Sequence, residues 1–309
     1  MPELIDIHGY SAETVYNILL NKMKLYGKIH GKTRELLNVN LIIYHPTNNF
    51  IRLRKNWAWC TWEMFDRLDP DFKNPGHSYI FRPNWQRKLE KEGGTFNYTY
   101  GDAYKKHIPD VLNRLRSKST RECVLTMWQN SYLTDPGRTP CTLTLHFMIR
   151  EERLHLFVTM RTNDVINLLP YDIWQHTTLQ MVIASLLGLK LGDYHHHVHQ
   201  AYWQKKRDNM PYVNNAIDIL SNSERYDLPP DDISYFEEDL KFLIYFANSA
   251  LAGKFSEIDQ LDESKNLIKS TLIREWLFVL ISSYAKFQYN NKIEFQFTRP
   301  DFKFIYDNL

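Results

Sequence analysis

The sequence predicts an α+β fold in which a mixed sheet is flanked by helices and followed by a helical C-terminal extension. Three β-rich runs follow one another between Cys123 and Thr162, separated only by short turn-forming or charged segments. A long apolar helical pattern comes next, over 172–188, and two more follow at about 232–252 and 264–288. With 309 residues, 43% of them hydrophobic, the chain can bury the core of one large domain or of a domain with an appendage.

Helices alternate with a strand in the N-terminal third of the chain. Ser11 is a suitable N-cap for the first apolar helical pattern. The β-rich segment that follows ends at His45-Pro46, which is typical of a strand that runs into a turn. A Gly-Gly pair marks a loop further on. Together these signals predict a helix over 11–26, a strand over 34–44, a buried helix over 57–68, a loop over 90–97 and a helix over 102–115.

The chain changes character at Asp208, where a polar stretch rich in turn-forming residues begins. Before it, the long apolar helix is expected to end at Gly188, because glycine is favoured just past helix C-termini. We therefore expect a catalytic domain over 1–208 and a mostly helical region over 209–309 that packs on it. The β-rich runs predict strands over 123–128, 141–149 and 154–162, and a last β-like run closes the chain at 292–306.

The composition of the chain argues against several classes of protein. The formal net charge of +2 is too small for the basic field of a nucleic-acid-binding protein, whereas a few placed arginines are enough to hold a small phosphorylated ligand. Three cysteines without CxxC spacing fit neither a disulfide framework nor a zinc site. The N-terminus has acidic residues rather than a basic region with an apolar run, and no window approaches about 18 apolar residues. We expect a cytoplasmic protein that binds neither nucleic acid nor a membrane.

Cys141 is the first candidate for chemistry. It follows Pro140 where a turn runs into a strand, a junction that exposes a sulfur to a cleft. Nearby cations make a thiol nucleophilic by stabilising its thiolate, and the folded sheet could bring Arg121, Arg138 and Arg161 close to it. The alternative is that Cys141 is a small buried hydrophobic residue.

Fixed spacings around Cys141 match a known family. Arg161 follows twenty residues after Cys141 and opens an Arg-x-x-Asp that ends at Asp164, and a Pro-aromatic-Asp triplet ending at Asp172 comes next without a gap. This frame resembles the thymidylate synthase superfamily over roughly 30–205. The resemblance implies the family fold and an obligate homodimer.

The resemblance also assigns roles to individual residues. Cys141 would supply the thiolate that adds to C6 of a pyrimidine ring and so makes C5 nucleophilic. Glu63 would relay protons to the base, and Tyr100, in a Tyr-Gly before a helix, belongs to the same catalytic set. Glu122 replaces the second arginine of a family pair, so one phosphate ligand is lost. The other candidates are Arg34, Arg121, Arg161 and Thr162 for the phosphate, with Arg121 contributed across the dimer interface, Asp164 for orienting the base contacts, and Trp85 for the co-substrate 5,10-methylenetetrahydrofolate.

The arginines and Glu63 could instead have structural or solvent-exposed roles that are common for these residue types. An arginine is often a solvated surface charge or one half of a structural ion pair. Glu63 could equally be an exposed glutamate on a helix. The binding role is best supported for Arg161, because its spacing from Cys141 matches that of the family.

Asp172 departs from the thymidylate-forming branch, which has Asn at this position. An Asn amide suits the N3–H and O4 of uracil, whereas a carboxyl group suits the N3 and the 4-amino group of cytosine. Uracil would place its O4 against a carboxyl oxygen of Asp172, and such a contact between two acceptors costs about 1 to 3 kcal/mol of binding free energy. Asp at this position resembles the deoxycytidylate hydroxymethylase branch, in which water quenches the one-carbon intermediate. Asp172 could also be the N-cap of the helix that it opens.

A histidine-rich segment, 192–204, carries the sugar-binding candidates. In the family a His-x-Tyr contacts the sugar 3'-hydroxyl. The connection is two residues shorter here and lacks the family's glycines, which leaves His199 or Gln200 together with Tyr202. The choice between ribose and deoxyribose therefore stays open.

The same segment has four histidines within five positions, which invites a metal site. Strand alternation would send His195 and His197 to one face of a sheet and His196 to the other. We therefore expect no metal there.

The sequence thus predicts an enzyme, a folate-dependent transferase that adds a hydroxymethyl group to C5 of dCMP or CMP. Two alternatives stay open. The first is true C5 methylation of dCMP or dUMP, with folate as the reductant. The second is a non-catalytic nucleotide-binding protein whose helical C-terminus is the functional surface.

Overall fold

The computed structural model describes residues 4–53, 56–91, 93–117, 121–134, 137, 139–208, 235–254, 268–290 and 293–309. The chain divides into two compact units, each assembled from two separated stretches. Unit 1 comprises Met1–Ile51 and Pro109–Asp227, and unit 2 comprises Arg52–Ile108 and Leu228–Leu309. The expected domain boundary after Asp208 stays a prediction, because residues 209–234 lie outside the described part of the chain.

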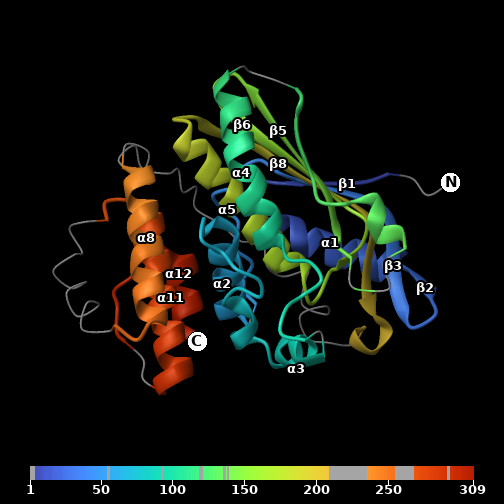
Figure 1. Ribbon diagram of the computed structural model, residues 1–309. Coiled ribbons are helices and arrows are strands. Elements are labelled where there is room, and N and C mark those ends of the chain that lie inside the picture. Colours follow the sequence, from blue (N-terminus) through green and yellow to red (C-terminus); the bar gives the residue numbers. More distant parts are fainter. Residues whose placement is uncertain are drawn as a thin grey trace. The chain divides into compact units, whose positions relative to one another are not determined.

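Unit 1 is built on one mixed sheet, in which Figure 1 shows β5, β6 and β8 side by side. The strand order is β1-β3-β8-β6-β5-β4, with β2 paired to β3 and β7 paired to β8. β1 runs parallel to β3, and β6 and β7 run parallel to β8, while the other neighbours are antiparallel. The strands are β1 (Ile5–Gly9), β2 (Lys28–His30), β3 (Thr33–Ile43), β4 (Cys123–Thr126), β5 (Thr142–Arg150), β6 (Arg153–Met160), β7 (Asn163–Asp164) and β8 (Lys190–Gln204). The predicted run of three consecutive strands is confirmed.

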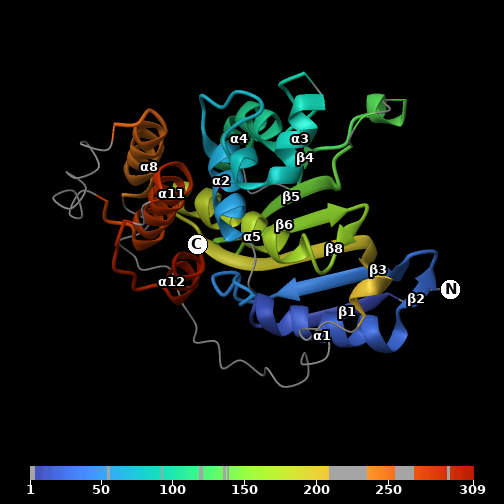
Figure 2. The ribbon, with the colours of Figure 1, turned by 90° about the horizontal axis from the view of Figure 1, so that it is seen from below.

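The first helix of unit 1, α1 (Ala12–Tyr26), begins where the sequence predicts. The hydroxyl oxygen of Ser11 accepts a hydrogen bond from the amide of Thr14 at 3.2 Å, which satisfies one of the unpaired amides of the first turn. α1 packs on β1 and β3, and Figure 2 shows it beside these strands. β1 was missed, because five residues with two isoleucines carry little strand signal without the neighbour that they pair with.

β8 divides its side chains between the two faces of the sheet. Alternate residues of its middle part are buried, namely Tyr194, His196 and Val198, and the residues between and after them are half-buried or exposed, namely His195, His197 and His199. His196 faces the helix α5 (Leu169–Leu186), where its ring lies 6.2 Å from the ring of His176. The predicted alternation of the histidines is confirmed.

The N-terminus of α5 differs from the expectation. The helix begins at Leu169, with Leu168 as its N-cap and Pro170 in its first turn, where a missing amide hydrogen costs little. The backbone amide of Asp172 already donates to the carbonyl of Leu168 at 3.0 Å, so the interpretation of Asp172 as the N-cap is wrong. The other end agrees with the sequence, because Gly188 follows the helix with a left-handed φ of +66°.

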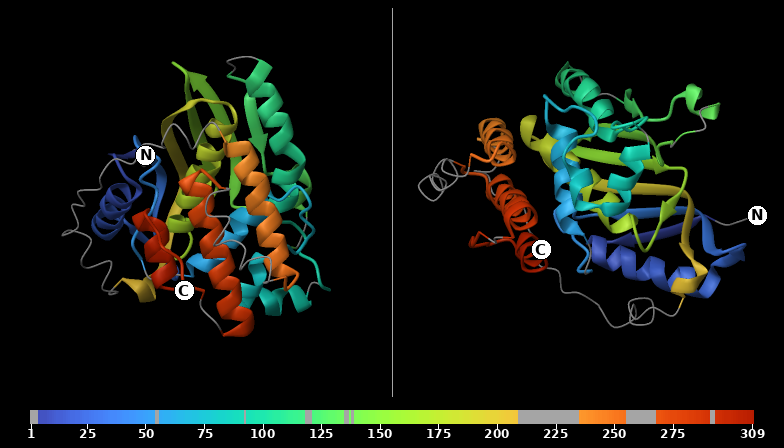
Figure 3. Two further views of the ribbon diagram at one scale, coloured as in Figure 1. Left: turned by 90° about the vertical axis from the view of Figure 1, so that its left-hand side faces the viewer. Right: turned by 60° about the horizontal axis from the view of Figure 1, so that its bottom comes forward.

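The described residues of unit 2 are mostly helical. Its elements are α2 (Trp57–Leu68), the 3-10 helix η1 (Ser78–Phe81), α3 (Pro83–Lys91), the first part of α4 (Tyr100–Ser117), α8 (Phe236–Leu251), α11 (Thr271–Tyr289) and α12 (Pro300–Asp307). α2 has the predicted limits, since the side-chain oxygen of Asn56 accepts from the amide of Trp59 at 3.0 Å and caps it. α8 and α11 pack against each other, as the orange and red helices in Figure 3 show. None of the described helices of the chain is long and apolar enough to cross a membrane.

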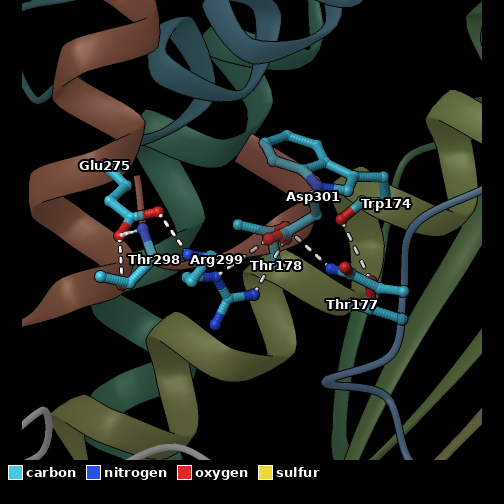
Figure 4. Close-up of polar contacts among 8 residues, drawn as sticks. Trp174, Thr177, Thr178, Glu275, Thr298, Arg299 and Asp301 are labelled. Atoms are coloured by element: carbon cyan, nitrogen blue, oxygen red, sulfur yellow. Dashed lines mark hydrogen bonds and ion pairs between the residues drawn. The ribbon is translucent and has the colours of Figure 1, made fainter. Parts of the chain in front are cut away.

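The last described element is a helix instead of the expected strand. The carboxylate of Glu275 accepts hydrogen bonds from the amides of Thr298 and Arg299, at 2.8 and 3.0 Å, and so fixes the residues that lead into α12 (Figure 4). Pro300 lies in the first turn of α12, where proline is favoured. Three buried side chains recur at helical spacing: Phe302, Ile305 and Tyr306. The strand predicted over 292–306 is therefore wrong, because proline and this spacing outweigh the alternation of β-formers.

Candidate functional site

The segment that carries Cys141 is tied to Arg161. The backbone amide of Arg161 donates to the carbonyl of Cys141 at 2.9 Å, and its Nε donates to the carbonyl of Pro140 at 3.0 Å. Its Nη2 also donates to the hydroxyl of Thr139 at 3.1 Å. The two residues meet because β5 and β6 form an antiparallel pair, so the twenty-residue spacing in the sequence is the length of that hairpin.

Cys141 is the accessible cysteine of the three. It is half-exposed, whereas Cys60 and Cys123 are buried. Burial raises the pKa of the Cys123 thiol, which keeps that group protonated. Of the arginines expected near Cys141, Arg161 lies against its segment and Arg138 lies outside the described residues.

Tyr202 lies in the same environment. The pKa of its hydroxyl is raised, first by burial and then by the charges of Asp164 and Cys141, while Arg161 acts to lower it. These four side chains therefore influence one another electrostatically. The raised pKa keeps the hydroxyl protonated, so Tyr202 can donate a hydrogen bond to a ligand.

Asp164 organises the turn that leads towards α5. One carboxylate oxygen accepts from the amides of Ile166 and Asn167, at 3.1 and 2.9 Å, and the other accepts from the side-chain amide of Asn167 at 2.8 Å. Charge-assisted hydrogen bonds of this kind are among the stronger ones in proteins. Asp164 thus fixes the backbone between Arg161 and the start of the helix that carries Asp172.

Thr162 is paired with Gln200. Its hydroxyl donates to Oε1 of Gln200 at 3.1 Å, and Nε2 of Gln200 donates to the carboxylate of Glu35 at 2.5 Å. Of the two alternatives for the sugar contact, the structure therefore brings Gln200 to Thr162. His199 is exposed, and its ring lies 5.3 Å from that of His197. Glu35 was missed, because only the pairing of β3 with β8 brings it to Gln200.

Asp172 is accessible in an otherwise buried stretch. Within the fully described helix α5, it is the one residue between 169 and 185 that is not buried. It lies in the first turn, where a negative charge is favourable because the backbone amides point towards it. Asp172 is therefore half-exposed at the start of α5.

Arg34 and Arg121 have different surroundings. Nε and Nη2 of Arg34 donate to the two carboxylate oxygens of Asp208, at 3.1 and 3.0 Å, and Nη1 donates to the carbonyl of Gly27 at 2.9 Å. The hydrogen bond from Arg34 is the main reason that the pKa of Asp208 is lowered. Arg121 is exposed, and its carbonyl accepts a hydrogen bond from the ring of His146 at 2.8 Å. Arg34 is thus engaged in an ion pair, whereas the Arg121 side chain faces solvent.

Unit 2 carries Glu63 and Tyr100. The carboxylate of Glu63 in α2 lies 3.6 Å from the guanidinium of Arg67, and that guanidinium lies 4.7 Å from the ring centre of Tyr100 at the start of α4. Two predicted site residues therefore meet at Arg67, which sequence reasoning missed. The only signal was a glutamate followed four residues later by an arginine, a pattern that is common on helix surfaces.

Trp85 belongs to an aromatic cluster of unit 2. Its ring centre lies 6.1 Å from that of Trp59 and 5.4 Å from that of Phe96. The guanidinium of Arg82 lies 4.2 Å from the ring centre of Trp59 and 5.5 Å from that of Trp85. Flat aromatic faces beside a cation suit a planar ligand that bears carboxylates.

A buried polar triad supports the 161–164 segment and was also missed. Nδ2 of Asn163 donates to Nε2 of His196 at 3.2 Å, and Nδ1 of His196 donates to the hydroxyl oxygen of Tyr194 at 2.7 Å. A neutral imidazole satisfies both contacts, since one nitrogen accepts and the other donates. Burial is the main reason that the pKa of His196 is lowered to about 3. The triad therefore holds a neutral histidine behind the site.

No metal centre is formed by the residues that the structure describes: they contain no group of three or more His, Cys, Asp or Glu side chains placed to hold an ion. The histidines of β8 are divided between the two faces of the sheet.

The sequence of this chain matches a known protein family. A family model described as "Thymidylate synthase" matches residues 33–218 of the chain. Cys141, Arg161, Asp164 and Asp172 all fall within the matched span.

Curated relatives are similar over part of their length. A thymidylate synthase of Bacillus mojavensis is 27% identical over 134 residues, which cover 43% of this chain and 43% of that protein. A thymidylate synthase of Bacillus licheniformis is 25% identical over 215 residues, which cover 66% of this chain and 70% of that protein. The chain thus spans less than half of the first of these relatives.

A solved structure supports the fold. The thermostable thymidylate synthase A from Bacillus subtilis superposes with a TM-score of 0.58 at 17% sequence identity, covering 74% of this chain and 91% of that one. The expected α+β fold with a mixed sheet flanked by helices is confirmed.

Proposed function

The chain belongs to the thymidylate synthase family. We propose that it hydroxymethylates C5 of cytidine 5'-monophosphate or its deoxy form. The one-carbon donor in this proposal is methylenetetrahydrofolate. The observation that carries the choice of substrate is the carboxylate of Asp172, the one accessible side chain between 169 and 185 of α5. Asp172 follows the turn that Asp164 fixes, directly after the segment bearing Arg161.

Cys141 is the nucleophile in this proposal. Its thiolate forms a bond to C6 of the base, which places an electron pair on C5. C5 then bonds to the one-carbon unit and loses its proton. The bond between that carbon and the folate nitrogen breaks, so tetrahydrofolate leaves with the electron pair and an exocyclic methylene group stays on C5. Water adds to the new exocyclic carbon, and departure of the sulfur from C6 restores the aromatic ring. Arg161 supports the thiolate by its charge and by holding the Pro140–Cys141 backbone.

Asp172 selects the base by hydrogen bonding in this proposal. A carboxylate accepts from the 4-amino group of cytosine and from a protonated N3, and a carboxylic acid donates to N3 while its carbonyl accepts from the amino group. Uracil instead places O4 against an oxygen of Asp172, and such an unmatched contact costs about 1 to 3 kcal/mol. Cytosine is therefore the preferred base.

Arginines and hydroxyl groups hold the rest of the nucleotide. Arg161 and Thr162 bind the phosphate from one side, and the exposed Arg121 of a second subunit completes the site in a homodimer. Arg34 joins them by exchanging the carboxylate of Asp208 for a phosphate, since both anions suit its planar fork. Tyr202, whose hydroxyl stays protonated, donates to the sugar.

The residues of unit 2 serve proton transfer and the co-substrate. Glu63 relays protons through water, and Tyr100 belongs to the same group through Arg67. The cluster of Trp85, Trp59 and Arg82 fits a folate, because it offers aromatic faces to the flat rings and a cation to the carboxylates. Methylenetetrahydrofolate supplies carbon at the oxidation level of formaldehyde, so addition of water needs no reductant.

The test is incubation of the protein with methylenetetrahydrofolate and each of CMP, dCMP, UMP and dUMP, followed by mass spectrometry of the nucleotide. We expect a gain of CH2O on a cytosine nucleotide. A gain of CH2 means methylation, the alternative with folate as the reductant. Failure to modify any of the four, together with no release of tritium from C5, would falsify the enzyme proposal.

Cys141→Ser is the control for the nucleophile. The variant should fold like the wild type and lose tritium release from C5, because serine at neutral pH is a far weaker nucleophile than a thiolate. Cys60 and Cys123 are buried, so serine at either position would disturb the core and would be a poor control. Cys141→Ala therefore serves as the second variant. Retained exchange in both Cys141 variants removes this residue from the mechanism.

A further inference from the structure

Glu35 in β3 is a half-buried acid whose partner is an amide. Its Oε2 accepts a hydrogen bond from Nε2 of Gln200 in β8 at 2.5 Å. Among the residues that the structure describes, no lysine or arginine lies within ion-pair distance of Glu35, and its Oε1 has no hydrogen-bond partner. A carboxylate that is partly removed from water costs free energy unless its oxygens are satisfied. Oε1 is therefore open to a donor that the described part of the chain does not supply.

The hydrogen bonds of Gln200 have one possible direction. A carboxylate only accepts, so the amide must turn its nitrogen towards Glu35. Oε1 of Gln200 then faces Thr162, whose hydroxyl donates to it at 3.1 Å. The three side chains thus form one chain of hydrogen bonds in which each proton points towards Glu35. Such a chain holds the carboxylate in a single orientation.

The chain of hydrogen bonds starts beside the segment that carries Cys141. Thr162 directly follows Arg161, whose backbone amide donates to the carbonyl of Cys141 at 2.9 Å. Glu35 lies opposite Tyr202 in the register of β3 and β8, two strands that Figure 2 shows side by side. Because directly opposed residues of a strand pair share a face, Glu35 and Tyr202 project from the same side of the sheet.

A local irregularity in β3 accompanies the placement of Gln200 on that side. Asn38 has a left-handed φ of +59° and interrupts the regular pairing with β8. In β8, burial alternates up to Val198 and then shifts by one residue, so that Ala201 is buried and Gln200 is half-buried. Without the shift, Gln200 would lie on the same face as the buried Val198. Gln200 instead lies on the half-exposed face that carries Glu35.

We propose that Glu35 makes the enzyme specific for a ribonucleotide, because its carboxylate accepts a hydrogen bond from the 2'-hydroxyl of the sugar while Gln200 orients it. The inference rests on the proposed function for the cytosine base and for Cys141 as the nucleophile. The sugar is bonded to N1, the ring atom next to C6, so it lies beside the atom that Cys141 attacks.

The chemistry of a ribose fits this pair of strands. Tyr202 donates to one sugar hydroxyl, and Glu35 accepts from the hydroxyl next to it. Acidic side chains bind the 2'-hydroxyl of a ribose in the same way in dinucleotide-binding folds. Deoxyribose has no hydroxyl at this position, so it leaves Oε1 of Glu35 without a donor.

The test is the affinity of the wild-type protein, without folate, for CMP, dCMP and 2'-fluoro-2'-deoxy-CMP, measured by isothermal titration calorimetry. We expect CMP to bind roughly tenfold to hundredfold more tightly than dCMP, because dCMP lacks a hydrogen bond to a charged acceptor. The fluoro analogue keeps a substituent at C2' but cannot donate, so it should bind no better than dCMP. Equal affinity for CMP and dCMP overturns the inference, and so does a fluoro analogue that binds as tightly as CMP.

Glu35→Ala identifies the acceptor. The variant should bring the ratio of the CMP affinity to the dCMP affinity close to one, because neither sugar then meets a carboxylate. Gln200→Met keeps Glu35 but removes both hydrogen bonds of the amide, so it should lower the ratio several-fold. An unchanged ratio in Glu35→Ala overturns the inference. If Glu35→Ala fails to fold, the three ligands on the wild type still decide it.

Asp6 provides a matched control. Its Oδ1 accepts from Nδ2 of Asn40 at 2.7 Å, which is also a hydrogen bond from an amide to a carboxylate between β3 and a neighbouring strand, but at an exposed position. Asp6→Ala therefore removes the same type of contact and the same charge. It should leave the affinity ratio unchanged. An equal fall in Asp6→Ala and Glu35→Ala shows a general effect of the lost charge and overturns the role of Glu35.

Binding and turnover separate this inference from the proposed function. The affinity ratio requires neither folate nor a reaction. If CMP binds with the expected preference and no nucleotide is hydroxymethylated, the inference stands and the proposed reaction is wrong. If CMP and dCMP bind equally and are hydroxymethylated with equal kcat/KM, the proposed reaction stands and the role of Glu35 is refuted. If neither nucleotide binds, both are wrong.

Discussion

Nε of Arg161 donates to the carbonyl oxygen of Pro140 at 3.0 Å, so its guanidinium is fixed against the residue that precedes Cys141. This contact makes Arg161 a support of the loop that carries Cys141, in addition to the phosphate ligand that we propose it to be. A lysine at this place keeps the charge but lacks the planar set of donors that reaches Pro140 and Thr139 together.

We therefore expect Arg161→Lys to reduce kcat/KM roughly thirtyfold, since loss of hydrogen bonds from a charged group costs about 2 kcal/mol. Steady-state kinetics with the accepted nucleotide measures this. Arg153→Lys is the control, because Arg153 also donates to a backbone carbonyl, that of Leu191 at 2.9 Å, but at an exposed site at the start of β6, the strand that Arg161 follows. Similar losses in both variants would assign the effect to the sheet and not to the site.

Asp172→Asn should shift the base preference towards uracil. The amide restores a donor for O4 and an acceptor for N3–H, so the ratio of kcat/KM for the cytosine nucleotide to that for the uracil nucleotide should fall roughly ten- to hundredfold. Competition between dCMP and dUMP measures the ratio directly. An unchanged ratio accompanied by a lower melting temperature would leave Asp172 with a role in helix stability only.

Arg121 should act in the active site of the other subunit. Arg121→Ala and Cys141→Ser are each expected to inactivate their own homodimers. A mixed dimer has one site with both defects and one intact site, so random mixing should restore about a quarter of the wild-type activity. The measurement is the activity of the two variants after joint refolding or co-expression. If the mixture stays inactive although mixed dimers form, Arg121 does not cross the interface.

His196 should make the protein less stable in acid. Its pKa is lowered to about 3 in the folded chain, whereas the unfolded histidine titrates near 6.5, so between these values the unfolded chain binds an extra proton. The contribution of His196 is complete above about pH 6.5 and is lost as the pH falls, by about 1.4 kcal/mol per unit. Urea unfolding between pH 7 and pH 5, compared with His196→Gln, isolates this slope.

The glutamine in that variant keeps one donor and one acceptor for Tyr194 and Asn163, but it does not titrate. The two stability curves should therefore converge as the pH falls. Parallel curves would mean that protonation of His196 does not drive the loss.

Local patterns predicted most of the secondary structure. The helix over 57–68 has the predicted limits because Asn56 and the run of buried side chains define it without distant partners. The closing segment shows the limit of such patterns: its alternation of β-formers predicted a strand, but the residues that precede Pro300 are held by Glu275, far back in the chain. A proline in the first helical turn then starts a helix.

The sequence alone determined the spacings that match the family. Cys141, Arg161 and Asp172 are separated by a hairpin and a turn, and the lengths of both are local properties of the chain. Tertiary structure decided which side chains meet around that frame. Gln200 instead of His199 reaches Thr162 because two strands distant in sequence pair in one register. Glu63 and Tyr100 share Arg67 because α2 and the start of α4 pack together. Spacing along the chain carries no information about such contacts, since they depend on how separate elements are placed in space.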